Sequence, residues 1–282
     1  MSGWVFIAVI AAAGLHALWN ALVKGGADKA LNMGAVVIGH LPLALVAISI
    51  SPLPTFESLP YLFAGLALHF GYQWFLLRAY QLGDLTQVYP IARGSAPLMV
   101  ALFSVLVLGV HLQGMELLAV AIIGAGIISL ALVRHADGLR NGNAAVLALI
   151  TGLFIATYSL VDGLGARLSG NSLGYFGWIA AGNAVIMALY LGFTAPQTLR
   201  AVPRKGLPVS LIGGSASFVA YALVTWAFTQ APIALVTALR ETSIIFALLI
   251  GVLFLKERLN LIKVVSTMTT LLGAVLLRFA RS

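Results

Sequence analysis

The chain alternates between long apolar segments and short polar ones along its whole length. An α-helix crosses a hydrocarbon core of about 30 Å with about 20 residues, and ten segments reach roughly that length. They lie at Gly3–Val23, Leu31–Ile50, Leu59–Leu82, Leu85–Gly109, Gly114–Val133, Ala144–Leu164, Leu173–Ala195, Leu207–Gln230, Ile233–Leu255 and Leu259–Phe279. This pattern predicts an all-α integral membrane protein with ten transmembrane helices.

Each half of the chain holds five of these segments, and the odd number has a topological consequence. The second half must enter the membrane from the side opposite to the first, which is typical of transporters built from inverted repeats. We therefore expect an N-terminal five-helix repeat over residues 1–138 and a C-terminal five-helix repeat over residues 139–282.

The two halves also share a weak sequence similarity at corresponding segments. Ala17-Leu18-Trp19-Asn20 falls on Ala156-Thr157-Tyr158-Ser159, and further along Ala79-Tyr80 falls on Ala227-Phe228. The register shifts by nine residues between these blocks, which the longer loop Pro196–Gly206 can absorb. Apolar sequences match easily by chance, but these matches recur at corresponding segments and agree with the count of five per half.

Composition supports a membrane location, because 61% of the residues are hydrophobic and 9% are charged. The net charge of +8 is compatible with nucleic acid as a partner, but the basic residues lie in short loops, which indicates membrane orientation instead. One set of loops carries Lys24, Lys29, Arg134, Arg140, Arg200, Arg204, Lys205, Lys256, Arg258 and Lys263. The positive-inside rule places this set in the cytoplasm and both termini outside. The expected location is the inner (plasma) membrane, as a multi-pass protein.

Arg93 and Glu241 are the charged residues placed deepest in the apolar segments. Each lies about nine residues into its segment, roughly 14 Å along a helix axis and therefore near the membrane midplane. They occupy the same position in the overlay of the two halves, so inverted symmetry would bring them together. We expect an Arg93–Glu241 pair that leaves Arg240 available for an anionic group. A purely structural ion pair is the alternative.

Three segments carry polar and aromatic side chains at helical spacing. These are His16 and Asn20 with Trp19 alongside, His69 and Gln73 with Tyr80 near the same face, and Tyr158 with Asp162. Residues four apart share one helix face, as the wall of a polar cavity requires. The alternative is hydrogen bonding between neighbouring helices. The isolated His40 and Asn183 are expected to be helix-packing residues.

Enzyme activity is not expected. Residues 162–167 match the opening of the motif of integral-membrane CDP-alcohol phosphotransferases, but that chemistry needs further aspartates, and the acidic residues after Asp162 are Glu241 and Glu257. The sequence also contains no Walker loop and no His-Glu-x-x-His helix. We therefore predict no catalytic residues, no metal, no cofactor and no transport driven by ATP hydrolysis in this chain.

Two motifs give the chain a resemblance to a known family. His16-Ala17-Leu18-Trp19-Asn20 and Leu253-Phe254-Leu255-Lys256-Glu257-Arg258-Leu259 resemble those of EamA-type ten-helix members of the drug/metabolite transporter superfamily. The resemblance implies two five-helix repeats around a central cavity lined by segments one, three, four, six, eight and nine. It also implies cytoplasmic termini, opposite to the loop charges. The corresponding place in the first repeat, Leu108-Gly109-Val110-His111-Leu112, lacks the second Gly-Glu of many members, so Glu257 is expected to be structural.

We predict a secondary alternating-access transporter, in the export direction, for small polar or zwitterionic metabolites such as amino acids. Arg93 and Arg240 would hold a carboxylate or phosphonate, and Glu241 would bind an amine or accept a proton if transport is coupled. The other substrate-binding residues predicted are His16, Trp19, Asn20, His69, Gln73, Tyr80 and Tyr158. The alternatives are a carrier for phosphonate-type or cationic drug-like compounds, and a non-transporting scaffold or sensor. The partners expected are a small-molecule substrate and the lipid bilayer, with no nucleic acid, for a monomer or homodimer.

Overall fold

The computed structural model describes residues 2–106, 114–131, 142–257 and 261–280, and every regular element in these ranges is a helix. The all-α prediction is therefore confirmed for the described residues. The elements are α1 (Gly3–Gly25), α2 (Lys29–Ile38), α3 (Leu41–Ser49), η1 (Phe56–Ser58), α4 (Leu59–Leu82), α5 (Leu85–Leu106), α6 (Gly114–Ala131), α7 (Gly142–Leu168), α8 (Ser172–Thr194), α9 (Pro196–Lys205), α10 (Leu207–Val209), η2 (Ser210–Gly214), α11 (Ser215–Gln230), α12 (Ile233–Arg240), α13 (Ser243–Leu253) and α14 (Leu261–Ala280).

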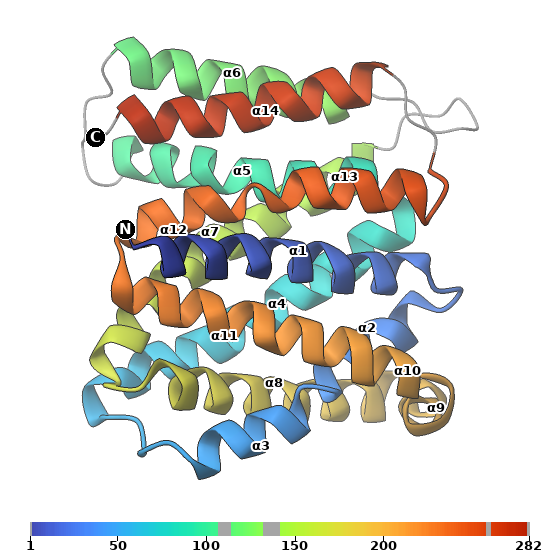
Figure 1. Ribbon diagram of the computed structural model, residues 1–282. Helices are drawn as coiled ribbons and strands as arrows, with labels where there is room; N and C mark the ends of the chain where they lie inside the picture. The colour runs from blue at the N-terminus through green and yellow to red at the C-terminus, as the bar shows by residue number, and fades with distance from the viewer. Residues whose placement is uncertain (1, 107–113, 132–141, 258–260, 281–282) are drawn as a thin grey trace.

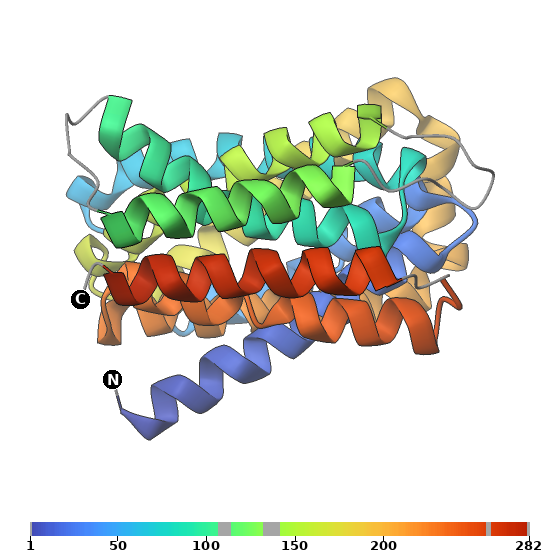
Figure 2. The same cartoon turned by 90° about the horizontal axis from the view of Figure 1, so that it is seen from above.

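Most of the long helices run roughly along one direction and form a bundle (Figure 1). Helices α6 and α14 lie at one side of the bundle, and α3 and α8 lie at the other. The view from above shows α1 projecting obliquely from the rest at its N-terminal end (Figure 2). The beginning of α1 and the end of α14 lie at the same end of the bundle in both views.

Six helical stretches are long and apolar enough to cross a membrane. They are Gly3–Gly25, Lys29–Ser49, Gly142–Leu168, Ser172–Thr194, Leu207–Gln230 and Leu235–Leu253. The remaining predicted spans correspond to α4, α5, α6 and α14. Helix α4 is long enough, but its polar side chains, among them His69, Gln73 and Arg78, lower its hydropathy. The apolar parts of α6 and α14 within the described residues are shorter. The length and composition of the helices thus indicate a membrane protein.

Two of the predicted helices are broken near their middle. The segment from Leu31 to Ile50 is interrupted at Gly39 and His40, and the segment from Ile233 to Leu255 at Glu241 and Thr242. The first break packs against η2, a turn of π-helix. A Cβ on Gly39 would lie 2.5 Å from the carbonyl oxygen of Ser210, so glycine is what allows the two backbones to approach.

The two halves of the chain are interleaved. Helix α1 packs against α11 and α13, α4 and α5 pack against α7, α3 packs against α8, and α6 packs against α14. The hydrophobic core therefore lies between the halves, with small residues such as Ala17, Ala79 and Ala227 fully buried. The predicted boundary at 138/139 lies outside the described residues, as does the motif at 108–112.

Hydrogen bonds between the halves also hold one end of the bundle together. Glu257 accepts hydrogen bonds from the backbone N–H groups of Leu85 (2.8 Å) and Thr86 (2.9 Å), at the start of α5. The first N–H groups of a helix have no partner inside it, so this carboxylate caps α5 and complements its dipole. This contact is what the sequence led us to expect of a structural Glu257.

Candidate functional site

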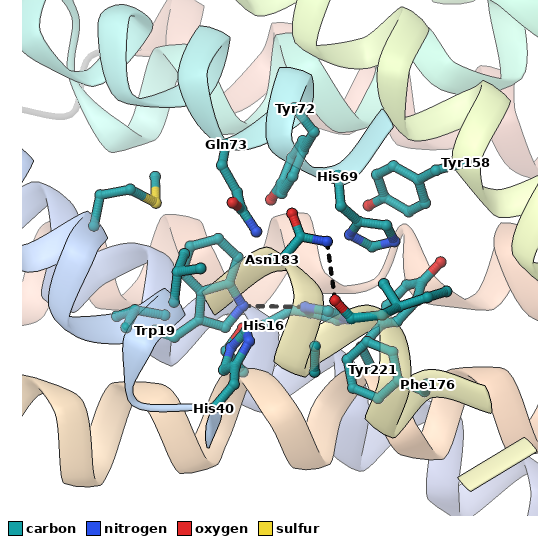
Figure 3. A pocket seen from close by; sticks show the side chains of 16 residues that line it. His16, Trp19, His40, His69, Tyr72, Gln73, Tyr158, Phe176, Asn183 and Tyr221 are labelled. Atoms are coloured by element: carbon teal, nitrogen blue, oxygen red, sulfur yellow. Dashed lines mark hydrogen bonds between the residues drawn. The ribbon is translucent and has the colours of Figure 1, made fainter. Parts of the chain in front are cut away.

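A narrow cavity lies in the interior of the bundle, and the space in it that the centre of a water molecule can occupy is about 40 Å³. Its wall comes from both halves of the chain, from α1, α2, α4, α7, α8, α11 and the break after α2. The lining residues are His16, Trp19, Met33, Val36, Val37, His40, His69, Tyr72, Gln73, Tyr158, Phe176, Ile179, Ala180, Asn183, Ser217 and Tyr221. Figure 3 shows their side chains converging from helices far apart in the sequence.

Aromatic rings form much of the wall. His69 stacks on Tyr158 with ring centroids 4.3 Å apart, and Tyr221 meets both rings edge to face. Phe176 packs on the other side of Tyr221, with centroids 5.0 Å apart. Such edge-to-face and offset contacts favour these ring orientations, and the rings give this part of the wall an apolar surface.

Several polar atoms of the wall have no hydrogen-bond partner among the described residues. They are Nε2 of His16, both ring nitrogens of His40, Oε1 of Gln73 and Oδ1 of Asn183. Trp19 donates its indole N–H to Nδ1 of His16 (3.2 Å), which makes Nε2 of that neutral ring the donor (Figure 3). Buried polar groups are normally paired, because an unpaired group costs about 1–3 kcal/mol. The wall thus offers donors and acceptors suited to a polar ligand.

A carboxylate stands directly behind this wall. Asp162 accepts hydrogen bonds at Oδ2 from Nε2 of His69 and from the hydroxyl of Tyr221, each at 2.7 Å. The Asp162 side chain is fully buried, whereas that of His69 is 10% exposed. The cavity therefore contacts the carboxylate through a histidine and a tyrosine rather than directly.

Arg240 also lies behind the wall. Its guanidinium donates to the hydroxyls of Ser159 (3.2 Å) and Tyr158 (3.4 Å), and lies 5.4 Å from the ring centroid of Tyr221. Arg240 is fully buried. Its positive charge thus reaches the cavity through Tyr158, whose hydroxyl it polarises.

Five of the ten predicted site residues line the cavity: His16, Trp19, His69, Gln73 and Tyr158. Asn20 and Tyr80 lie outside the lining and bond each other, with the Tyr80 hydroxyl donating to Oδ1 of Asn20 at 2.7 Å. Arg93, Arg240 and Glu241 also lie outside it. A role of any of the ten in binding stays a prediction.

The expected hydrogen-bonded pair of Arg93 and Glu241 does not form. Both carboxylate oxygens of Glu241 are buried without a hydrogen-bond partner among the described residues. Glu241 stands at the break between α12 and α13, and the Arg93 guanidinium lies over the Tyr89 ring, 5.8 Å from its centroid. The overlay placed both residues near the midplane but did not indicate that the helix is interrupted at Glu241.

Sequence reasoning missed other parts of the wall. His40 and Asn183 were expected to pack between helices, and they line the cavity instead. Tyr72, Phe176 and Tyr221 were not singled out. Continuing the overlay would have found Tyr221, because it falls on Gln73 in the second register. Within the described ranges, no group of three histidine or acidic residues could hold a metal ion.

Comparison with known proteins gives two findings. Residues 142–279 match the model of the EamA-like transporter family. A solved structure described as "Crystal structure of protein" has a similar fold, with a TM-score of 0.61 and 17% identity over 98% of this chain and 96% of the other. At this identity the likeness concerns the fold alone. No curated protein matches the sequence.

Proposed function

The chain belongs to the EamA-like transporter family, and from this we propose that it is a secondary transporter of small polar or zwitterionic metabolites such as amino acids. The family consists of membrane transporters of small molecules, and the helices here have the length and hydropathy that a membrane protein requires. The observation that carries the proposal is the interior cavity, whose wall presents unpaired donors and acceptors from both halves. Such a site suits a polar ligand held near the middle of a membrane.

The cavity lining supports two repeated halves of five transmembrane helices each. If the two registers of the sequence overlay are continued, lining residues fall on other lining residues. The pairs are Trp19 with Tyr158, Val37 with Phe176, His40 with Ile179, His69 with Ser217, and Gln73 with Tyr221. Equivalent positions of two related repeats are expected to face each other across a pseudo-twofold axis.

Helix packing supports the same arrangement. In the overlay α1 corresponds to α7, and α4 corresponds to α11. Exchanging the halves therefore turns the contact of α1 with α11 into the contact of α7 with α4, and both are present. The contact of α3 with α8 and the contact of α6 with α14 each join corresponding parts of the two halves, so exchanging the halves leaves these contacts unchanged. An inverted repeat with a twofold axis in the membrane plane accounts for this pattern.

The charge of the wall favours net-neutral ligands over the phosphonate and cationic alternatives. Among the described residues that line the cavity, none is Lys, Arg, Asp or Glu. Because a net ionic ligand would need a charged partner in this low-dielectric interior, a zwitterion is the better match. Its carboxylate would approach Tyr158, which Arg240 polarises, and its ammonium would approach His69 and Tyr221, which lie on Asp162.

The transport cycle would be alternating access, in the export direction, across the inner (plasma) membrane. The breaks at Gly39–His40 and Glu241–Thr242 provide places where half-helices can rotate without unfolding whole spans.

Transport by purified protein tests this proposal. Proteoliposomes loaded with a mixture of unlabelled L-amino acids should exchange them for the ¹⁴C-labelled mixture outside, whereas protein-free liposomes should not. Gln73→Leu removes a free acceptor from the wall and should slow exchange by about tenfold. Gln87→Leu is the matched control, because Gln87 is equally buried but bonds the carbonyl of Leu130 outside the cavity. Absence of exchange, together with ligand binding in a thermal-shift assay, would favour a scaffold or sensor instead.

A further inference from the structure

His69 and Asp162 form a buried pair at which the cavity wall meets an interior carboxylate. Nε2 of His69 and Oδ2 of Asp162 are 2.7 Å apart, and the hydroxyl of Tyr221 donates to the same oxygen at 2.7 Å. The three side chains come from α4, α7 and α11, so they join the two halves of the chain. Gly65 on α4 makes room for this arrangement, since a Cβ there would lie 2.6 Å from Oδ1 of Asp162.

The hydrogen bonds determine where a proton can be added. The carboxylate can only accept, so Nε2 of a neutral His69 carries the hydrogen that bonds Asp162, and Nδ1 is the free base of the ring. Within the described part of the chain, Nδ1 has no hydrogen-bond partner. The His69 ring lines the cavity, so the free base lies on the side chain that a ligand or water there would meet.

Two charged side chains contact the rings of the wall when His69 is neutral. Arg240 lies against Tyr158 and Tyr221, and Asp162 accepts hydrogen bonds from His69 and Tyr221, so one positive and one negative charge balance there. A proton on Nδ1 would leave these contacts with one net positive charge. A net charge is costly in a dry membrane interior but is readily solvated when the cavity opens to water. Opening and closing of the cavity would therefore change how firmly the proton is held.

Other titratable groups face the pair from every helix packed around it. They are Tyr158 on α7, Tyr175 on α8, Tyr221 on α11, His16 on α1, His40 between α2 and α3, and Arg240 on α12. His16 is already fixed as a neutral donor by Trp19, and the tyrosines are weak acids. Among the histidines that the structure describes, His69 is the one that bonds Asp162 directly.

We propose that the cluster of His69, Asp162 and Tyr221 is the proton-coupling site of the transport cycle, with Nδ1 of His69 as the atom that binds and releases the proton. This inference rests on the proposed transport function. It assigns the coupling proton to His69 in the cavity wall, whereas the sequence pattern suggested Glu241. Because the proton site and the ligand cavity share His69, ligand and proton each change the affinity for the other.

A titration without ligand tests the proton site directly. The protein labelled with ¹⁵N-histidine is purified in detergent, and its ring nitrogen signals are followed from about pH 4 to 9. The signal lost in His69→Gln identifies His69. We expect these signals to show that Nδ1 of His69 binds one proton, and that Asp162→Asn weakens this binding because the negative charge beside the ring is lost. A ring that stays neutral throughout, or a midpoint unchanged in Asp162→Asn, would overturn the proposal even if transport is observed.

A flux assay tests the coupling. Proteoliposomes that contain the pH-sensitive dye pyranine receive the L-amino acid mixture on one side, so that net transport must move protons as well. The wild type should change the internal pH, and in Asp162→Asn this change should fall by about tenfold or more relative to the ¹⁴C exchange that the same variant shows between equal amino acid pools. Asp84→Asn is the matched control, because Asp84 pairs with Lys263 at the end of the bundle and should keep both activities.

The two assays separate failure of the coupling site from failure of the function. Wild-type exchange without any pH change, or a pH change that persists in Asp162→Asn, would contradict the coupling site. Absence of exchange in the wild type would contradict the transport function itself, and the histidine titration would then decide the proton site alone. Tyr221→Phe provides a second variant that keeps the ring but removes one hydrogen bond to Asp162.

Discussion

At the scale of single residues, the cavity wall is organised by polar contacts behind its aromatic rings. Tyr158 is the clearest case, since its ring stacks on His69 in the wall while its hydroxyl accepts a hydrogen bond from Arg240. Arg240 has a second acceptor in Ser159, and its Nε has no partner among the described residues. The orientation of this ring thus depends on a buried charge that the ligand does not touch.

Tyr158→Phe should therefore destabilise the protein as well as weaken transport. The variant keeps the ring but removes the acceptor, leaving a buried guanidinium less well bonded, which costs about 1–3 kcal/mol. Thermal unfolding in detergent should show a lowered midpoint. Tyr61→Phe serves as control, because no hydrogen bond of the Tyr61 hydroxyl is present within the described residues. Equal midpoints for the two variants would contradict the account of Arg240.

At the scale of helices, the sequence predicted where helices form but not where they break. The apolar segments from Gly3 to Val23 and from Ala144 to Leu164 are each covered by one helix in the structure. The break at Gly39 has a local signal that the count of apolar segments passed over, because Pro42 in the first turn of α3 has no backbone N–H to continue the preceding helix. The break at Glu241 could not be predicted, because no proline lies between Ile233 and Leu255. At the first break the α2–α3 connection also packs closely against η2, a tertiary contact that no local pattern records.

The break at Gly39 gives a direct prediction. Gly39→Ala would place a Cβ against the Ser210 backbone, which must shift, so we expect a loss of about 1–3 kcal/mol. Gly14→Ala is the matched control, because a Cβ at Gly14 in α1 meets nothing within 4 Å. That change should be neutral or stabilising by up to about 1 kcal/mol, as alanine is the better helix former. Chemical or thermal unfolding in the same detergent compares the two, and a Gly39→Ala protein as stable as Gly14→Ala would refute the close contact.

At the scale of the whole molecule, half of the predicted site coincides with the cavity. His16, His69 and their neighbours were found because helical spacing puts them on inward faces. Arg93 and Glu241 were predicted from depth in the membrane, and depth alone does not say whether a side chain faces a cavity or a packed interior. Of the six segments expected to line the cavity, segments one, three, six and eight do, whereas the described lining residues contain none from segments four and nine and several from segments two and seven.

The ends of the chain provide a test of the membrane orientation. Helix α1 begins and α14 ends at the same end of the bundle, so both termini should lie on one side of the membrane (Figure 1). The loop charges place that side outside the cytoplasm. A C-terminal alkaline phosphatase fusion should be active and a C-terminal green fluorescent protein fusion dark. The reverse result would show cytoplasmic termini, as the family resemblance implies.

The central claim is that the interior cavity is the path of the substrate, and thiol labelling tests it most directly. The chain has no cysteine, so a single substitution to cysteine introduces the only thiol that a maleimide can label. Ser217→Cys introduces a thiol into the cavity wall, and Ser49→Cys introduces one at the exposed end of α3. In proteoliposomes, a membrane-impermeant maleimide should label the thiol at position 217, and this labelling should be about tenfold slower when the L-amino acid mixture is present. The thiol at position 49 should be labelled at the same rate with and without the mixture. A thiol at 217 that never reacts, or that reacts equally fast with and without amino acids, would contradict the account.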